Sequence, residues 1–463
     1  MNLLPLLEKY DRPVPRYTSY PTVPFWKDNL DIPSWTTAFY NRFSACNRTD
    51  GLSLYIHLPF CETLCIYCGC NKKITANHKV EAEYLEAVFS EWEMYRALMD
   101  EPPVIREIHL GGGTPTFFSP ENLDRLVSGL LERSVVHPDH SFSFEGHPNN
   151  TTRAHLDCLY RLGFRRVSYG VQDLNPEVQQ AIHRIQSFEC LHRATEEARA
   201  SGFTAVNFDL IYGLPLQTLE RLQFTLLQAA SLRPDRLAFY SYAHTPSLNC
   251  TQRLIREEDL PSAAAKLELY HQGKHWLTQL GYTNIGMDHF ALPGDELHKA
   301  WVDKTLHRNF MGYTTQAGGM LLGLGVSAIS DTGSAAFAQN DKIFTHYYSR
   351  ITAGHLAVQK GYFLSEEDRV FRQYILDIAC QGCTIFDPAW SPVLAEWTFP
   401  VLRELAADGI VELDERQVSL TEAGRPFLRH VCKAFDLHLL RDERNRGGAE
   451  LRCGKSAVFS RAI

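Results

Sequence analysis

The chain has 463 residues, of which 44% are hydrophobic and 22% are charged, and its formal net charge is −8. This composition is that of an ordinary folded protein, and it excludes the fibrous and disordered classes. The negative balance argues against sequence-independent binding of nucleic acid, which needs a surplus of Lys and Arg. The length exceeds what one hydrophobic core usually serves, so we expect a large catalytic domain with smaller appended parts.

Residues 1–50 form the first expected part. They contain the Pro- and Tyr-rich run YDRPVPRYTSYPT, which has no periodicity and predicts an extended arm lying on another surface. The N-terminus has neither a basic segment nor a long apolar run, so we expect no signal peptide, no membrane span and a cytoplasmic location. In that compartment the twelve cysteines should be reduced thiols.

Residues 51–350 alternate short β-rich runs with amphipathic ones, which predicts an α/β domain with a parallel sheet. Six such units with right-handed crossovers favour a full or partial barrel, and an open sheet is the alternative. In a barrel the carboxyl ends of the strands carry the chemistry. The expected strands are 52–58, 107–110, 141–145, 166–172, 205–212 and 236–242, and the expected helices are 80–98, 120–133, 154–162, 188–201 and 218–232.

Residues 351–463 form a smaller, mainly helical C-terminal domain. Helices are expected at 365–380, 392–408 and 421–440, with a hairpin at 409–420. Helices followed by a hairpin resemble a winged helix. Because the segment lacks a Lys- and Arg-rich recognition helix, we interpret it as a packing unit or lid rather than a DNA-binding module.

Three cysteines stand at C-x3-C-x2-C in HLPFCETLCIYCGC, directly after the first expected strand. They are Cys61, Cys65 and Cys68, and thiolates in one short loop can face one point. Cubane iron-sulfur clusters are normally held by four cysteines, so three leave one iron open to a ligand from outside the chain. Cys70 follows two residues later, and we interpret it as a neighbour rather than a fourth ligand.

A structural zinc site is the competing interpretation of these cysteines. Such sites prefer paired C-x2-C knuckles or Cys/His sets that supply four ligands, and the sequence has no matched second pair nearby. Cys380 and Cys383 form a lone C-x2-C at the end of an expected helix, without a companion motif. We expect this pair and the remaining cysteines to be inert thiols.

Long blocks of the sequence resemble the oxygen-independent coproporphyrinogen III oxidases, a family of radical S-adenosylmethionine enzymes. The resemblance runs in register from the arm to the last residues. The blocks are RYTSYPT (16–22), YIHLPFCETLCIYCGCNK (55–72), LGGGTPT (110–116), YGVQDLNPEVQ (169–179), NFDLIYGLP (207–215), GMDHFA (286–291), HRNFMGYTTQ (307–316) and FSRAI (459–463).

The resemblance implies a partial radical S-adenosylmethionine barrel and a step of haem biosynthesis. Two propionates of coproporphyrinogen III are oxidatively decarboxylated to vinyl groups by a 5'-deoxyadenosyl radical, which gives protoporphyrinogen IX. The implied cofactors are one 4Fe-4S cluster and S-adenosylmethionine. The implied partners are the tetrapyrrole substrate, an electron donor protein and an electron acceptor, and we expect a monomer.

The resemblance also implies which residues contact S-adenosylmethionine, and most of them stand at expected strand ends. Arg184 can pair with the methionine carboxylate through its planar guanidinium. Glu145 and Asp209 can accept hydrogen bonds from the ammonium or ribose hydroxyls. The implied contacts are Tyr55, Tyr67, Gly112, Gly113, Thr114, Glu145, Gln172, Arg184, Asp209, Ala243 and Ile329.

A substrate with four carboxylates requires local basic residues on a chain of net charge −8. Candidates lie inside or beside the resembling blocks. We expect the arm, the HRNF segment and the FSR tail to close over the macrocycle with these side chains, which are Arg16, Lys72, His307, Arg308 and Arg461.

Four positions depart from the family pattern. His147 stands in place of Asp, and His183 and Ile185 flank Arg184 in place of Asn and Glu. Met311 stands in place of Gln and lacks the side-chain amide that the family has near a second S-adenosylmethionine. The resemblance therefore implies one such cofactor and leaves the second open. Two rival hypotheses follow: a haem-chaperone or other tetrapyrrole-acting paralogue, and a cluster-based sensor that uses the winged-helix-like tail.

Overall fold

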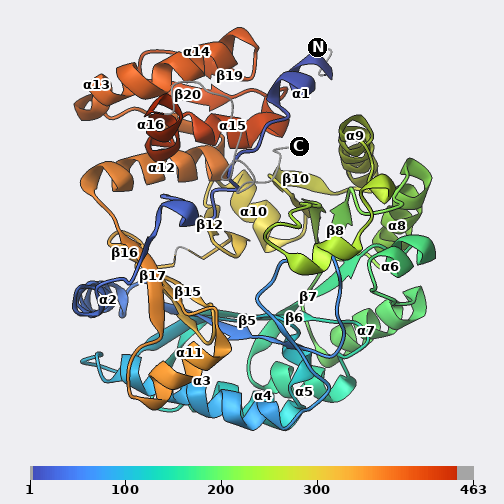
Figure 1. Ribbon diagram of the computed structural model, residues 1–463, viewed down its shortest axis with the longest axis vertical. Coiled ribbons are helices and arrows are strands. Elements are labelled where there is room, and N and C mark those ends of the chain that lie inside the picture. Colours follow the sequence, from blue (N-terminus) through green and yellow to red (C-terminus); the bar gives the residue numbers. More distant parts are fainter. Residues whose placement is uncertain (1–3, 317, 446–463) are drawn as a thin grey trace.

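The computed structural model describes residues 4–316 and 318–445. Among these residues, thirteen strands form one mixed sheet, which Figure 1 shows at the centre of the molecule. From one edge to the other its strands are β1 (Lys27–Asp28), β17 (Val358–Phe363), β16 (Ala336–Asn340), β15 (Ile329–Asp331), β14 (Met320–Leu324), β2 (Leu52–Leu58), β5 (Val104–Gly112), β6 (Val135–Gly146), β7 (Phe164–Gln172), β8 (Ala205–Tyr212), β9 (Arg236–Ser241), β11 (His289–Ala291) and β10 (Thr283–Gly286).

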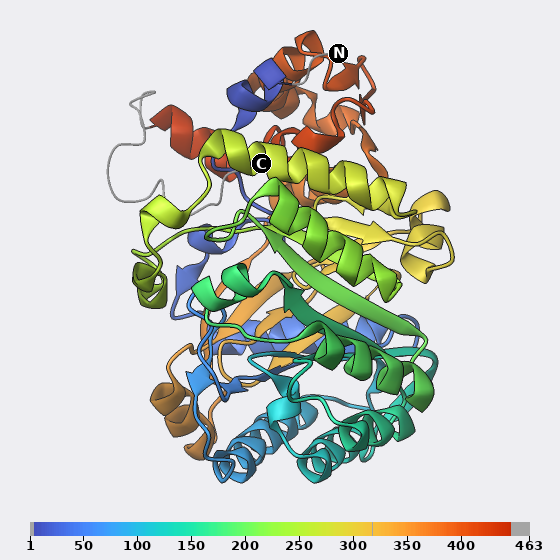
Figure 2. The same cartoon turned by 90° about the vertical axis from the view of Figure 1, so that its right-hand side faces the viewer.

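The strands from β14 to β9 run parallel, and helices connect β2 to β9 in βα units. These helices lie on the outside of the curved sheet (Figures 1 and 2). The sheet has free edges at β1 and β10, so the barrel is partial, as the sequence predicts. The outer helices are α3 (Val80–Arg96), α4 (Pro120–Leu131), α5 (Arg153–Arg161), α6 (Pro176–Ala181), α7 (Phe188–Ser201), α8 (Leu219–Ser231) and α9 (Ala263–Gln279).

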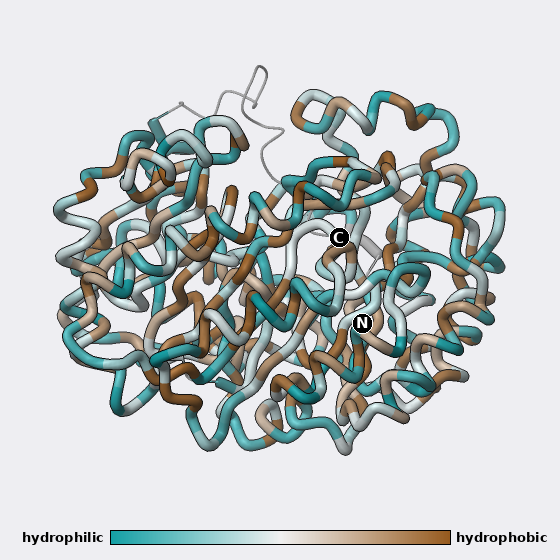
Figure 3. Tube along the Cα trace, turned by 90° about the horizontal axis from the view of Figure 1, so that it is seen from below, coloured by the Kyte–Doolittle hydropathy of each residue, from teal (hydrophilic) through white to brown (hydrophobic). Residues whose placement is uncertain are grey.

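Strand β8 shows why this sequence builds a barrel with a polar interior. Its apolar residues, such as Phe208 and Leu210, alternate with polar ones and are buried beneath the outer helices. Because side chains alternate across a strand, Asn207 and Asp209 point to the opposite face. That face lines a cavity of about 150 Å³ together with residues of β5, β6, β7 and β9. The helices pack apolar faces on the sheet, and hydrophilic and hydrophobic stretches alternate along the chain trace in Figure 3.

Helix ends follow local capping rules. Ser187 starts α7 by accepting a hydrogen bond from Cys190 N, and Gly202, with φ of 102°, ends it in the left-handed conformation. Thr152 and His155 form a capping box at the start of α5. These caps explain why several predicted boundaries agree with the structure to within two residues.

The strands that extend the sheet beyond the six predicted ones are short. β15 and β16 form an antiparallel excursion after β14, and β11 and β10 extend the other edge. Further elements of the domain are β3 (Phe60–Cys61), β4 (Lys73–Ile74), the hairpin β12 (His307–Asn309) and β13 (Gly312–Thr314), α10 (Glu296–Val302) and α11 (Phe344–Thr352).

The N-terminal segment is only partly the extended arm that the sequence suggests. Residues 11–22 are irregular, but α1 (Leu4–Tyr10) and the fifteen-residue α2 (Ile32–Cys46) flank the arm, so the prediction of an extended conformation is wrong for those stretches. Asp31 caps α2, and Trp35, Phe39 and Phe43 bury its inner face. These apolar residues recur at i, i+4 and i+8, which is the pattern of a helix with one buried face. The prolines nearby hide this pattern in the sequence.

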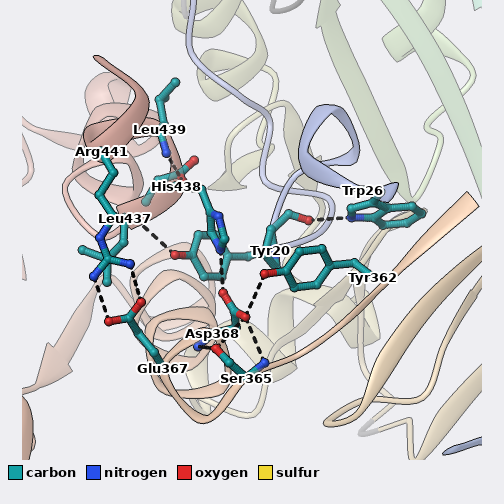
Figure 4. A network of polar contacts seen from close by, with 12 residues as sticks. Tyr20, Trp26, Tyr362, Ser365, Glu367, Asp368, Leu437, His438, Leu439 and Arg441 are labelled. Atoms are coloured by element: carbon teal, nitrogen blue, oxygen red, sulfur yellow. Dashed lines mark hydrogen bonds and ion pairs between the residues drawn. The ribbon is translucent and has the colours of Figure 1, made fainter. Parts of the chain in front are cut away.

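The arm is tied to the C-terminal domain. Tyr17 Oη donates to Asp436 Oδ2 over 3.1 Å, and Tyr20 Oη accepts from Leu437 N over 3.2 Å. Figure 4 shows Tyr20 beside His438 and Asp368, and His438 Nε2 lies 2.6 Å from Asp368 Oδ1. The arm therefore packs against the C-terminal domain.

The C-terminal domain is mainly helical, as predicted. The segment predicted as one helix at 421–440 is instead two helices separated by a turn, and a π-helical turn at Leu394–Thr398 precedes Pro400. Nowhere in the part of the chain that the structure describes is there a helix apolar and long enough to cross a bilayer. The elements are α12 (Glu366–Gln381), β18 (Cys383–Ile385), α13 (Ser391–Val393), α14 (Phe399–Ala407), β19 (Val411–Leu413), β20 (Gln417–Leu420), α15 (Leu428–Lys433) and α16 (Leu437–Asn445).

Candidate active site

The loop that carries the three cysteines begins at the carboxyl end of β2, and its last residues pair with its first ones. β3 and β4 pair in parallel, with Thr75 N donating to Cys61 O over 2.9 Å and Lys73 N donating to Pro59 O over 2.9 Å. Between these strands the chain makes a compact turn in which Cys68 N donates to Cys65 O over 3.2 Å. These backbone hydrogen bonds fix the conformation of the loop.

Cys61, Cys65 and Cys68 line one cavity of about 500 Å³. Thr114 Oγ1 donates to Cys61 Sγ over 3.3 Å, and Arg184 Nη1 donates to Cys65 Sγ over 3.5 Å. Burial raises the pKa of Cys61 to about 11, and the neighbouring Cys68 and Cys65 add to this rise. Positive iron bound in this cavity would favour the thiolate forms of all three thiols.

This donor set fits a 4Fe-4S cluster. Within residues 4–316 and 318–445, no three His, Cys, Asp or Glu side chains are close enough together to hold a single metal ion. In a cubane each thiolate binds a different iron, so its ligands surround a common cavity rather than a common point. Cys70 also lines the cavity and hydrogen-bonds Cys68, which lowers the pKa of Cys68 to about 6. All described cysteines are free thiols, Cys380 and Cys383 among them.

The glycine run at the end of β5 packs against the cysteine loop. Gly113 N donates to Leu58 O over 2.8 Å, and Thr114 N donates to Phe60 O over 2.9 Å. A Cβ at Gly113 would lie 2.6 Å from the carbonyl carbon of Pro59, closer than real Cβ contacts allow. Glycine is therefore required here for close approach of two backbones, and the run forms one wall of the cavity.

Two carboxylates enter the cavity from β6 and β8, the strands on either side of β7, and they differ in protonation. Burial opposes the charge of Glu145, but a hydrogen bond with His109 and another from Gly112 N, at 3.2 Å, hold its pKa below the usual value. Burial raises the pKa of Asp209 to about 7, and the charge of Glu145 adds to this rise. Glu145 is thus a permanent anion at neutral pH, whereas Asp209 titrates there.

Arg184 extends over the cavity from the segment after α6. Its Nη1 contacts Cys65, its Nη2 donates to Gly170 O, and its Nε is buried without a partner. A buried unpaired N–H costs free energy, so this group fits a ligand that brings an acceptor. Nine of the residues implied to contact S-adenosylmethionine line this same cavity: Tyr67, Gly112, Gly113, Thr114, Glu145, Gln172, Arg184, Asp209 and Ala243.

Comparisons with known proteins agree with this geometry. The family model of the Radical SAM superfamily matches residues 55–229, which include the cysteine loop. The chain is 40% identical over 446 residues to the oxygen-independent coproporphyrinogen III oxidase of Escherichia coli K12, covering 94% of this chain and 95% of the relative. It belongs to the oxygen-independent coproporphyrinogen III oxidase family. The Pseudomonas aeruginosa relative is 39% identical with the same coverage.

A solved structure extends the comparison to the fold. Coproporphyrinogen III oxidase from Escherichia coli, described as a radical SAM enzyme, superposes with a TM-score of 0.87 at 38% identity and covers 94% of this chain and 98% of its own. This family member is therefore a radical S-adenosylmethionine oxidoreductase, and its family implies one 4Fe-4S cluster and S-adenosylmethionine as cofactors.

Two of the implied contacts lie outside the cavity. Tyr55 stands on β2 beneath Gly111, donates or accepts a hydrogen bond with His57 Nδ1 at 3.0 Å, and packs edge-on against Phe310. Ile329, on β15, packs in the cluster around Trp26 and Phe337. Their contact with the nucleotide stays a prediction.

The predicted substrate residues divide between two cavities. Arg16 and Lys72 line the cysteine cavity, whereas His307 and Arg308 line a neighbouring cavity of about 550 Å³. Arg308 Nη2 donates to Arg16 O over 3.2 Å, so the hairpin and the arm touch each other. Arg461 lies outside the described residues.

The departures from the family pattern also have definite surroundings. His147 lines the cysteine cavity, and burial, together with the charge of Arg184, lowers its pKa to about 3, so it is neutral at pH 7. Met311 packs with Tyr55 in an apolar cluster. His183 and Ile185 are exposed beside Arg184, and neither lines the cavity.

Two residues that shape the site are not predicted from the sequence. His109 supports Glu145 from β5, where strand alternation could have indicated an interior position. Gln252 is buried and donates to Tyr67 O over 2.9 Å and to Ala243 O over 3.2 Å, which joins the cysteine loop to the end of β9. It lies in the short 3-10 helix Cys250–Leu254, which carries no periodic signal in the sequence.

Proposed function

We propose that this chain catalyses the oxygen-independent oxidative decarboxylation of two propionates of coproporphyrinogen III to vinyl groups, giving protoporphyrinogen IX. One observation carries the proposal: a single cavity at the carboxyl ends of the strands collects the three loop cysteines and nine of the residues expected to contact the nucleotide. The relatives that match 94% of the chain are oxygen-independent coproporphyrinogen III oxidases, which supports the substrate.

In this reaction the chain's own residues bind and orient the cluster and the nucleotide. Cys61, Cys65 and Cys68 would hold the cluster, and the unpaired Nε of Arg184 would meet the methionine carboxylate. Glu145 and Asp209 would accept hydrogen bonds from the ammonium or ribose. The cluster and the nucleotide supply the hydrogen-abstracting chemistry when bound, and the protein supplies position and exclusion of water.

Arg16 and Lys72 are the proposed contacts to substrate propionates at the reacting end. The charge of Arg16 is only partly neutralised by Asp288, because the separation between Arg16 Nη1 and Asp288 Oδ2 is as long as 3.5 Å. At an effective dielectric of about 20, a charge pair at about 4 Å gains roughly 4 kcal/mol before desolvation. Arg308 and His307, from the adjacent cavity, would hold carboxylates further along the macrocycle.

We infer one S-adenosylmethionine per chain, because Met311 lacks the amide that the family pattern has near a second one. Equilibrium dialysis with reconstituted protein measures this stoichiometry, and a value of two would overturn the inference. We further propose that the chain works as a monomer and that a donor protein and a separate acceptor carry its electrons.

The test of the function is anaerobic reconstitution with iron and sulfide, reduction with dithionite, and addition of S-adenosylmethionine and coproporphyrinogen III. We expect protoporphyrinogen IX with two carbon dioxide molecules released per substrate. Formation of 5'-deoxyadenosine without a vinyl product would keep the enzyme class and reject the substrate. Tight haem binding without turnover would favour the haem-chaperone paralogue.

A further inference from the structure

A group of exposed residues lies one strand away from a cluster cysteine. In the β3–β4 pair, Ile74 stands opposite Cys61, and adjacent strands are about 4.8 Å apart. Ile74 is 40% exposed. Its neighbour Lys73 is also exposed, and its Nζ lies 5.4 Å from the ring centre of Phe344. An apolar and a basic side chain therefore reach solvent on the outer side of the cysteine loop.

A second segment of the chain completes this surface. Asn71 Nδ2, on the cysteine loop, donates over 2.9 Å to the carbonyl of Lys342, which follows β16. Since β16 runs antiparallel to β15, β15 antiparallel to β14, and β14 parallel to β2, Lys342 lies at the same sheet edge as the cysteine loop. Ile343 is 52% exposed beside it.

We call Lys73, Ile74, Lys342, Ile343 and Lys360 the lysine patch. Lys360, which is half-buried, stands opposite Gln339 in the β16–β17 pair, three residues before Lys342 in the chain, and burial together with the charge of Lys360 lowers the pKa of Lys342. Among the residues that the structure describes, none of these three ammonium groups takes part in an ion pair, although the chain as a whole carries a net charge of −8.

The acidic residues around the patch leave its charge largely uncompensated. Asp28 stands opposite Lys360 in the β1–β17 pair, yet no ion pair joins them. Glu62, on the cysteine loop, is engaged by Asn150 and by His78. Lysines around two exposed isoleucines form a surface that can attract an acidic partner by its charge and hold it through a small apolar contact.

We propose that the lysine patch is the docking surface for an acidic one-electron carrier protein that reduces the cluster. The proposal rests on the proposed function, because only a redox enzyme of this class needs such a donor. The carrier loses one electron, the cluster gains it, and no bond forms or breaks. Electron transfer falls steeply with distance, and a carrier on the patch would sit against the strand pair that contains Cys61. Interfaces of redox partners are small, which fits a patch of five residues.

The test uses reconstituted protein and reduced plant-type ferredoxin as the acidic carrier. The variants are Lys342→Glu and the triple variant Lys73→Glu, Lys342→Glu and Lys360→Glu. The matched control is Lys299→Glu, since Lys299 is exposed without an ion pair on α10, which packs on β10 at the opposite end of the strand order. Three quantities are measured: the dissociation constant of the carrier, the stopped-flow rate of cluster reduction by the carrier, and turnover driven by dithionite.

We expect the triple variant to bind the carrier about tenfold more weakly or worse and to be reduced by it correspondingly more slowly. Raising the ionic strength should weaken carrier binding by the wild type more than by the triple variant, because salt screens the lysines. Lys299→Glu should behave as the wild type, and dithionite-driven turnover should be unchanged in all variants.

Each result decides the question. Unchanged carrier binding by the triple variant, or an equal loss in Lys299→Glu, overturns the docking surface. Loss of dithionite-driven turnover, with normal iron content and melting temperature, would show that the lysines serve the substrate and would also overturn it. If wild-type protein binds the carrier through the patch but forms no vinyl product, the proposed substrate fails and the docking surface stands.

Discussion

Replacing Arg184 with Gln should weaken binding of S-adenosylmethionine without removing the cluster. The guanidinium already gives one hydrogen bond to Cys65 Sγ and one to Gly170 O, and its Nε is buried with no acceptor. A charge-assisted hydrogen bond to a carboxylate contributes about 1.5–3 kcal/mol. At about 1.4 kcal/mol per factor of ten, the dissociation constant should rise roughly 10- to 150-fold.

The assay is anaerobic isothermal titration of reconstituted protein with S-adenosylmethionine. Arg184→Lys should keep part of the affinity, because it retains the charge but loses the planar geometry. Arg193→Gln, an exposed arginine on α7, is the matched control and should bind as the wild type. Iron content and melting temperature are measured alongside. An unchanged dissociation constant in Arg184→Gln with a full cluster would refute the role assigned to Arg184.

Three further predictions follow from the packing and the charges. Gly113→Ala should cost about 1–3 kcal/mol of stability and lower the iron content after reconstitution, because its Cβ meets backbone at 2.6 Å, whereas Gly294→Ala, with open space around it, should keep wild-type iron. Arg236→Met removes the guanidinium whose Nε lies 2.7 Å from Asp295 Oδ1, so the buried carboxylate keeps the hydrogen bond from Leu297 N but loses its ion pair; calorimetry should show a loss of about 3–5 kcal/mol, partly recovered by adding Asp295→Asn. The raised pKa of Asp209, about 7, gives stability that is present below the unfolded value of 3.8 and is lost as the pH rises through 7. Asp209→Asn cannot ionise, so its melting temperature relative to the wild type should be higher at pH 8 than at pH 5, and a constant difference would contradict the assignment.

The sequence predicts most accurately the elements whose information is local. Strands β2 and β8 and helix α7 have the predicted bounds, because each has a clear periodicity and a clear stop. The strands β14 to β17 were not predicted. β15 has three residues, and its partners in the sheet are fixed by pairing between segments rather than by its own pattern.

In the candidate site, too, some features are predicted from local sequence and others depend on tertiary contacts. The spacing of Cys61, Cys65 and Cys68 by itself indicates a cluster loop, since three thiols in eight residues can reach one cavity in any compact turn. The spacing does not reveal which charges face that cavity. Burial raises the pKa of both Glu145 and Asp209, but hydrogen bonds with His109 and from Gly112 N lower that of Glu145 again, and these contacts arise only when β5 and β6 lie side by side in the sheet.

The sequence by itself thus determined the class of cofactor, the βα repeat and the family resemblance, because these depend on residue types at short, fixed intervals. Tertiary structure alone decided that Arg184 covers Cys65, that the arm is tied to the C-terminal domain at Asp436, and that Lys342 adjoins the cysteine loop. Those contacts join residues from 119 to 419 positions apart, and packing of the whole chain, rather than any local preference, selects them.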